Sequence, residues 1–162
     1  MALVFVLLDG RRHDRAGFSC GVAALDDYLR QRAGQHQRDG IATTHVLIDA
    51  ARPERILGYC SLSAAQLCLH DLREQDRKRL PAYPVPAMRM GRLAIAASEQ
   101  GKGHGRLLLG HAVNLALSVR QSMGVRVLLV DAKDAQAAAF YEGYGFRKTS
   151  DEALTLYLPI AP

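Results

Sequence analysis

The first half of the chain alternates between apolar runs and one amphipathic stretch. The run from Met1 to Leu8 is apolar and ends before a polar turn, so it predicts a first strand. From Val22 to Ala33 apolar residues recur at helical spacing, which predicts an amphipathic helix that ends by Gly40. Ile41 to Asp49 and Ile56 to Leu67 flank a turn and are rich in strand-forming residues, so together they predict an antiparallel hairpin.

A charged segment and three prolines separate this half from the next. Asp71 to Leu80 is mostly charged and contains good helix formers. Pro81, Pro84 and Pro86 follow, and prolines disfavour regular structure, so we expect a long loop here of the kind that borders active sites.

Strands and helices alternate in the second half. The pattern predicts a strand at Met88 to Ile95, a helix from about Arg106 with Leu107, Leu108, His111, Ala112, Leu115 and Val119 on its buried face, a strand at Val125 to Val130 buried on both faces, a short helix at Ala135 to Tyr141, and a last strand at about Ala153 to Leu158.

Length and composition limit the class of protein. A chain of 162 residues that is 49% hydrophobic can bury a sizeable core, so we expect a single domain over residues 1–162. The apolar run at the N-terminus is too short to span a bilayer, and we expect a cytoplasmic protein with no membrane association. Cys20, Cys60 and Cys68 form no CxxC pair, which favours reduced, buried thiols over disulfides or a zinc site.

The net charge of +5 suggests an anionic partner. Basic residues form two groups, which are Arg73, Arg77, Lys78 and Arg79 in one segment, and Arg89, Arg92, Lys102 and Arg106 around a glycine-rich loop. These groups suit the phosphates of a cofactor and the backbone of a nucleic acid. For the first group, a solvated helix face is an equally good interpretation.

The glycine-rich loop is the hexapeptide Gln100 to Gly105, between a predicted strand and a predicted helix. Alternate glycines let backbone N–H groups approach a ligand, and the helix N-terminus adds partial positive charge. A Walker A loop needs Ser or Thr where Gly103 stands, and a dinucleotide fingerprint needs a third glycine where Arg106 stands. The loop therefore predicts a site for another anionic cofactor, and the alternative is a surface turn that caps the helix.

Two linked motifs resemble the GNAT acetyltransferase family. They are Gln100-x-x-Gly103-x-Gly105 between a strand and a helix, and Asp134-x-x-Ala137-x-x-Phe140-Tyr141-x-x-x-Gly145-Phe146 after the next strand. Further stretches resemble the GNAT toxins of the TacT and AtaT kind: Phe18-x-Cys20-Gly21-x-x-x-Leu25-Asp26-x-Tyr28-Leu29, Gly58-Tyr59-x-Ser61-Leu62, Gly91-Arg92-Leu93-Ala94-Ile95 and Val130-Asp131-Ala132. This similarity covers nearly the full length of the chain.

The resemblance implies an α+β (α/β) fold of the GNAT type, in which a mixed, mostly antiparallel sheet flanked by helices splays apart at an acetyl-CoA site. It implies that the pyrophosphate of acetyl-CoA lies on the backbone of Gln100, Gly101, Lys102, Gly103, His104, Gly105 and Arg106, and that the pantetheine arm pairs with Leu93, Ala94 and Ile95. Asp134 stands where many members carry Asn, and it is a further candidate for cofactor binding. We expect the His104 side chain to be exposed.

Tyr141 occupies the family position of the catalytic tyrosine, which protonates the departing thiolate. The chemistry suits this role, because the unperturbed pKa of tyrosine is about 10 and that of a thiol is about 8.5. Met88 to Ile95 contains no acidic residue where many lysine-acetylating members place a base. An α-amine titrates near 7.7–8.0 and needs less help than lysine, so the missing base fits aminoacyl-tRNA as the substrate.

The resemblance thus implies a toxin that acetylates the α-amine of aminoacyl-tRNA and inhibits translation, without a metal. Candidate tRNA contacts are Arg77, Lys78, Arg79, Arg89 and Arg92. The expected partners are a ribbon-helix-helix antitoxin and a second copy of the chain. One alternative is a GNAT enzyme for protein N-termini or small amines, and another is a non-catalytic module that binds coenzyme A or nucleic acid.

Overall fold

The computed structural model describes residues 1–160, which form two compact units. The first unit comprises Met1–Ser63 and Arg92–Ala112, and the second comprises Ala64–Gly91 and the residues from Val113 onward. Three elements contribute residues to both units, namely β3 (Gly58–Leu67), β4 (Val85–Ile95) and α4 (His104–Val119).

The first unit is built on antiparallel strands. β1 (Leu3–Leu7) pairs with β2 (Thr43–Asp49), and β2 pairs with the start of β3. The predicted hairpin is therefore confirmed. Its apolar side chains pack into a core around Leu29, Val46 and Tyr59, each 0% exposed.

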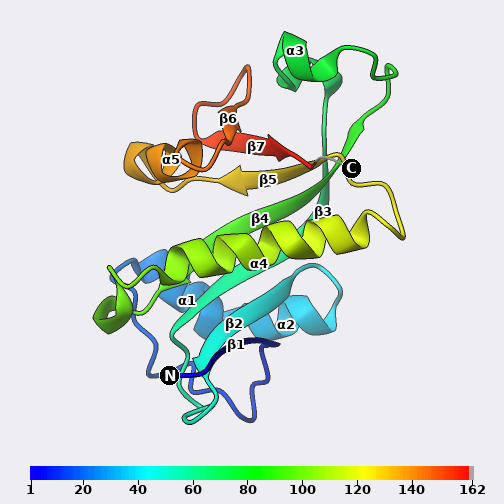
Figure 1. The fold of residues 1–162 in the computed structure, drawn as a ribbon. Coiled ribbons are helices and arrows are strands. Elements are labelled where there is room, and N and C mark those ends of the chain that lie inside the picture. The colour runs from blue at the N-terminus through cyan, green and yellow to red at the C-terminus, as the bar shows by residue number, and fades with distance from the viewer. Residues whose placement is uncertain (161–162) are drawn as a thin grey trace. The chain divides into compact units, whose positions relative to one another are not determined.

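The single amphipathic helix that the sequence predicts is two helices in the structure. α1 (Ala23–Gln31) ends at Arg32, whose φ of −125° lies outside the helical range, and α2 (Ala33–Arg38) follows at once. Both helices contact each other, and α2 also lies against β2 (Figure 1). The apolar spacing is continuous across Arg32, so the sequence pattern did not indicate a break between two helices.

The second unit contains the one parallel pair among the described strand registers. β4 runs parallel to β5 (Val127–Asp131) from Ala87↔Val127 to Met90↔Val130, and β5 is antiparallel to β7 (Thr155–Pro159). The strand β6 (Arg147–Lys148), which the sequence did not predict, pairs with β7. Residues Val127 to Val130 are all buried, which confirms that this strand is covered on both faces.

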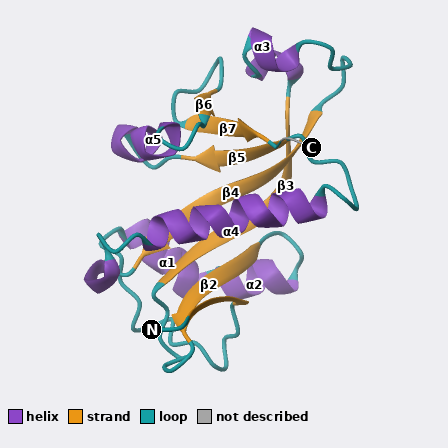
Figure 2. Ribbon diagram, in the orientation of Figure 1, coloured by secondary structure: helices purple, strands orange, loops and turns teal. Residues whose placement is uncertain are grey.

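The strand order of the sheet is β1-β2-β3-β4-β5-β7-β6. The sheet is mixed and mostly antiparallel and is accompanied by helices, as expected (Figure 2). In the second unit, α5 (Ala135–Glu142) lies beside β7. No helix within residues 1–160 is long and apolar enough to cross a membrane.

The charged and proline-rich segment differs from its prediction. Only a short 3-10 helix η1 (Leu69–Asp71) and the four-residue helix α3 (Glu74–Arg77) form there. β4 already begins at Val85 and includes Pro86, which has no N–H but still contributes a hydrogen bond, because its carbonyl accepts the N–H of Arg126. The proline loop is therefore shorter than predicted.

Outside the glycine loop, two predictions about burial were wrong. Leu107 is 41% exposed, whereas its neighbour Leu109 is 3% exposed and faces the core. Cys20 and Cys60 are buried as expected, but Cys68 is exposed.

Candidate active site

The glycine-rich loop follows β4 and a short 3-10 helix, η2 (Ala97–Glu99), and ends where α4 begins at His104. Gly101 and Gly103 have φ angles of 81° and 84°, which residues with a Cβ rarely adopt. Apart from each glycine and its two chain neighbours, no atom of the described residues lies within 4 Å of the position that a Cβ would occupy at either glycine. The loop therefore has room above it for a ligand, next to the N–H groups of the first turn of α4.

Gln100 fixes the start of the loop. Its side-chain amide donates to the carbonyls of Cys20, at 2.9 Å, and Ile95, at 3.0 Å. The Gln100 side chain thus ties the loop to the segment before α1 and to the end of β4.

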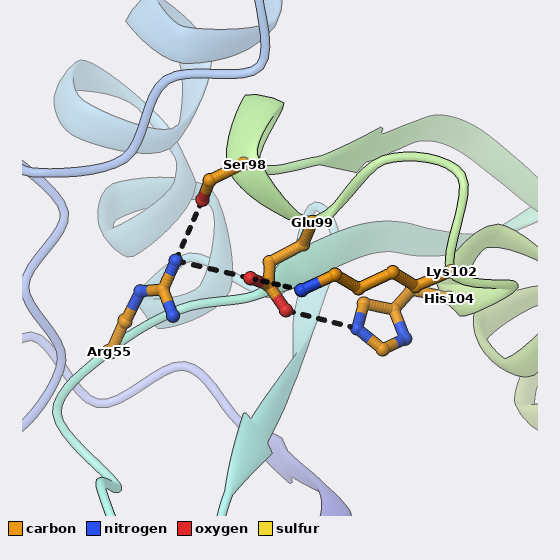
Figure 3. A network of polar contacts seen from close by, with 5 residues as sticks. All are labelled: Arg55, Ser98, Glu99, Lys102 and His104. Atoms are coloured by element: carbon orange, nitrogen blue, oxygen red, sulfur yellow. Dashed lines mark hydrogen bonds and ion pairs between the residues drawn. The ribbon is translucent and has the colours of Figure 1, made fainter.

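A buried carboxylate, Glu99, holds three basic side chains around the loop (Figure 3). Its Oε2 contacts Lys102 Nζ at 3.2 Å and Arg55 Nη2 at 3.4 Å, and its Oε1 contacts His104 Nε2 at 3.3 Å. The hydrogen bond from Lys102 lowers the pKa of Glu99 most; burial opposes this, and His104 and Arg55 lower it further. An ionised carboxylate therefore stabilises the conformation of the loop through its contacts with Lys102 and His104.

His104 is 4% exposed, so the expectation of an exposed residue was wrong. The physical reason is Glu99, which gives the ring a hydrogen-bond partner inside the protein. The other ring nitrogen, Nδ1, is buried and has no hydrogen-bond partner in the part of the chain that the structure describes.

The β4 backbone next to the loop is the segment expected to pair with the pantetheine arm. Ala94 is buried, and Leu93 and Ile95 are half-buried. The register of β4 with β5 ends at Met90↔Val130, whereas β4 continues to Ile95. Gly58 lies against this segment: a Cβ there would be 3.0 Å from the Ala94 carbonyl oxygen and 2.8 Å from Ile95 Cδ1.

Tyr141 is carried by α5 and is 4% exposed. Its ring packs against Phe140 and Phe146, with centroid separations of 5.3 and 5.5 Å. Tyr144 is 45% exposed and contacts Phe140 alone among these rings. Of the two tyrosines, Tyr141 is therefore the one whose ring is buried and packed on both neighbours.

Asp134 has a structural role at the start of α5. It is the N-cap residue, and its Oδ1 accepts the N–H of Ala137 at 2.8 Å. The Asp at this position keeps the capping function that Asn would also supply.

The candidate tRNA-binding residues lie in different surroundings. Arg77, Lys78 and Arg79 end α3, and Lys78 and Arg79 are exposed. α3 is held to the sheet by Asp76, whose carboxylate accepts hydrogen bonds from Tyr157, at 2.5 Å, and from Arg147. Burial raises the pKa of Asp76, but the hydrogen bonds from Arg147 and Tyr157 outweigh it and bring the pKa below its ordinary value.

Arg89 and Arg92, both on β4, are half-buried and already engaged. The Arg92 guanidinium carbon lies 3.5 Å from the centroid of the Tyr28 ring. Arg89 Nη1 lies 3.5 Å from Asp131 Oδ2, while its buried Nε has no partner among the described residues.

Asp131 belongs to the motif Val130-Asp131-Ala132, but the sequence interpretation gave it no place in the site. It ends β5, directly after the last residue pair that β5 forms with β4. The signal was present, because ligands of sheets with parallel strands bind beyond the carboxyl ends of those strands. Using it required knowing that β4 and β5 are parallel neighbours.

The strand, glycine loop and helix, and the capped helix with a buried tyrosine after the next strand, are the elements that the motifs of a coenzyme A-dependent acyltransferase predict. Residues 42–148 match the model of the acetyltransferase (GNAT) domain, and the chain belongs to this family.

Relatives and solved structures extend this match. The chain is 34% identical to a tRNA-acetylating toxin of Mycobacterium tuberculosis (strain ATCC 25618 / H37Rv), over 90% of this chain and 85% of that protein. It is similar to AtaT complexed with acetyl-methionyl-tRNAfMet, with a TM-score of 0.90, 28% identity and 97% and 94% of the two chains covered. It is also similar to a tyrosine-to-phenylalanine mutant of AtaT bound to acetyl-CoA and the C-terminus of the antitoxin AtaR, with a TM-score of 0.83, 27% identity and 99% and 94% covered.

Proposed function

We propose that this protein is a toxin that transfers the acetyl group of acetyl-CoA to the α-amine of aminoacyl-tRNA and thereby inhibits translation. The observation that carries the proposal is the open glycine loop at the start of α4, in a chain similar over 90% of its length to a tRNA-acetylating toxin.

The loop suits the pyrophosphate of acetyl-CoA. Gly101 and Gly103 leave space above the backbone, and the Lys102 and Arg106 side chains are cations close to it. The backbone of Leu93, Ala94 and Ile95 would hold the pantetheine arm, and Asp134 would shape the nearby end of α5.

Tyr141 would act as the general acid. Its hydroxyl would give a proton to the sulfur of the departing thiol, which is favourable because tyrosine has the higher unperturbed pKa. The AtaT structure with acetyl-CoA contains a tyrosine-to-phenylalanine mutation, which supports a functional tyrosine in this group of proteins.

Aminoacyl-tRNA is favoured as the acceptor by two observations. The AtaT structure contains acetyl-methionyl-tRNAfMet, and the chain has a net charge of +5 with exposed basic residues at Lys78 and Arg79. Arg77, Lys78 and Arg79 would neutralise phosphates of the acceptor, and Arg89 and Arg92 would lie nearer to the reacting end.

The deciding experiment is transfer of labelled acetyl groups from acetyl-CoA to three acceptors: a mixed aminoacyl-tRNA pool, a peptide with a free N-terminus, and a small amine. We expect label on the aminoacyl-tRNA, released as acetylated amino acid after ester hydrolysis. Labelling of the peptide or small amine alone would replace the proposal with the other GNAT activity. If acetyl-CoA is not consumed with any of the three acceptors, the result would contradict both the proposed toxin activity and the other GNAT activity.

The proposed partners are a ribbon-helix-helix antitoxin and a second copy of this chain, and the proposed location is the cytoplasm. The C-terminus of AtaR bound to AtaT supports the antitoxin. If a small gene lies immediately upstream, co-expression of its product should restore growth. Light scattering of the purified protein should give twice the mass of the chain. A single-chain mass would remove the homodimer from the proposal.

A further inference from the structure

Asp131 lies where β4 and β5 part. Its carboxylate Oδ2 is 3.9 Å from the position that a Cβ would occupy at Gly91. Gly91 and Asp131 each directly follow the last pair of the two strands, Met90↔Val130. The Asp131 side chain is 37% exposed, so the carboxylate can be reached by a ligand.

Glycine at position 91 is what leaves this carboxylate accessible from β4. A side chain there would come within van der Waals contact of Oδ2. Arg89, two residues earlier on the same strand, has its Nη1 3.5 Å from the same oxygen. One oxygen of Asp131 therefore faces a cation, and the carboxylate lies at the carboxyl end of β5, where its parallel pairing with β4 stops. Sheets with parallel strands bind ligands at such positions.

The geometry points to Asp131 as a catalytic residue that binds the attacking α-amine and stabilises the positive charge that develops on its nitrogen. The inference takes the identity of the amine, that of aminoacyl-tRNA, from the proposed function. It requires only that some amine accepts the acetyl group. It supplies from β5 the carboxylate that the sequence lacks between Met88 and Ile95.

The step balances as follows. The neutral amine nitrogen forms a bond to the thioester carbonyl carbon, and the carbon–sulfur bond breaks. The sulfur takes a proton from the Tyr141 hydroxyl, and the nitrogen gives a proton to the Asp131 carboxylate. Solvent then removes the proton from Asp131 and returns one to Tyr141, so the products are the amide and the free thiol.

The pKa values of the two kinds of group indicate at which stage of the reaction Asp131 acts. Carboxylic acids as a class have pKa values about four units below that of an α-ammonium group, so a carboxylate does not efficiently deprotonate the amine before attack. During bond formation the nitrogen becomes cationic, and a fixed anion beside it stabilises that charge in the transition state. The effect therefore belongs to the transition state and should appear in kcat.

The test compares Asp131→Asn and Asp131→Glu with wild type, using aminoacyl-tRNA and an amino acid methyl ester as acceptors. Asp39→Asn, an exposed residue at the end of α2, is the control for loss of one negative charge. Asp131→Asn should lower kcat by about 10- to 100-fold with both acceptors and leave the KM for acetyl-CoA unchanged. Asp131→Glu should recover part of the loss, and the control should match wild type.

Three results would overturn the inference. The first is an equal kcat in Asp131→Asn and wild type. The second is a higher KM for tRNA with no change for the methyl ester, and the third is a loss of kcat that Asp131→Glu does not reduce although both variants keep the wild-type Tm. The second result would mean that Asp131 acts only by holding Arg89 for the RNA. If wild type modifies the methyl ester but not aminoacyl-tRNA, the proposed function fails, and the comparison on the ester still decides the role of Asp131.

Discussion

Glu99 directly precedes the glycine loop and His104 lies near its end, and their buried side chains are joined by a contact of 3.3 Å between Oε1 and Nε2. This contact stabilises the loop through side chains, so the backbone N–H groups of the loop and of the first turn of α4 can bind a ligand. Removing a buried charge with three basic partners is costly in stability, because the partner groups are then left without an opposite charge or a hydrogen-bond acceptor.

Glu99→Gln should therefore destabilise the protein by about 1–3 kcal/mol, which corresponds to a Tm lower by roughly 5 °C. The lowered pKa of Glu99 means that its contribution is complete above the unfolded-state pKa and is lost as the pH falls toward the lower folded-state value. The Tm difference should thus shrink between neutral pH and strong acid. Glu54→Gln, at an exposed position, should show no difference at either pH.

Gly58→Ala should damage the segment of β4 beneath the proposed pantetheine site. The new methyl group would lie 3.0 Å from the Ala94 carbonyl oxygen, and that backbone atom cannot move away without shifting the strand. We expect a loss of about 1–3 kcal/mol in stability and a higher KM for acetyl-CoA. Gly110→Ala is the matched control, because no described atom lies within 4 Å of its Cβ position on α4, and it should stabilise by roughly 0.5–1 kcal/mol.

His45 and His111 form a half-buried pair with 2.9 Å between Nδ1 and Nε2, and Phe5 stacks on His111. Burial and the neighbouring His111 lower the pKa of His45 to about 4. Between the unfolded-state value of about 6.5 and this value, the unfolded chain binds more protons, so stability falls as the pH falls.

Wild type should therefore lose several degrees of Tm between pH 7 and pH 5 through this pair. His45→Gln should lower the Tm at pH 7 but flatten its dependence on pH, whereas His70→Gln, at an exposed histidine, should keep the wild-type slope. Equal slopes in wild type and His45→Gln would show that another group governs acid stability.

Local patterns predicted most elements, and they failed where a contact between particular side chains or strands decided the outcome. The apolar run ending at Val130 and the spacing of Gly101 and Gly103 carry their structure in the sequence itself. His104 is buried because Glu99 lies across the loop, and Asp131 is accessible because Gly91 stands on the neighbouring strand. The first relationship depends on how the loop turns back on itself, and the second depends on the pairing of β4 with β5, and neither can be read from hydrophobic spacing.

Tyr141→Phe should abolish acetylation and leave the affinity for acetyl-CoA nearly intact. The ring keeps its contacts with Phe140 and Phe146, so only the hydroxyl is lost. Loss of a general acid lowers kcat by about 100- to 10,000-fold. Tyr144→Phe removes the hydroxyl of a residue that is 45% exposed and should retain activity, and a Tyr141→Phe protein as active as wild type would remove this residue from the mechanism.

Replacing Arg77, Lys78 and Arg79 together by glutamine should weaken tRNA binding and reduce its dependence on salt. Each phosphate contact releases bound cations, so loss of up to three contacts should lower the slope of log K against log salt by about 2–3. The change should leave transfer to an amino acid methyl ester untouched, because that acceptor carries no phosphates. The matched control is the replacement of Arg11, Arg12 and Arg52 by glutamine, which removes the same charge from exposed positions in the first unit. If both triple variants lose the same affinity, the protein binds RNA through its net charge, and the end of α3 has no special part in recognition.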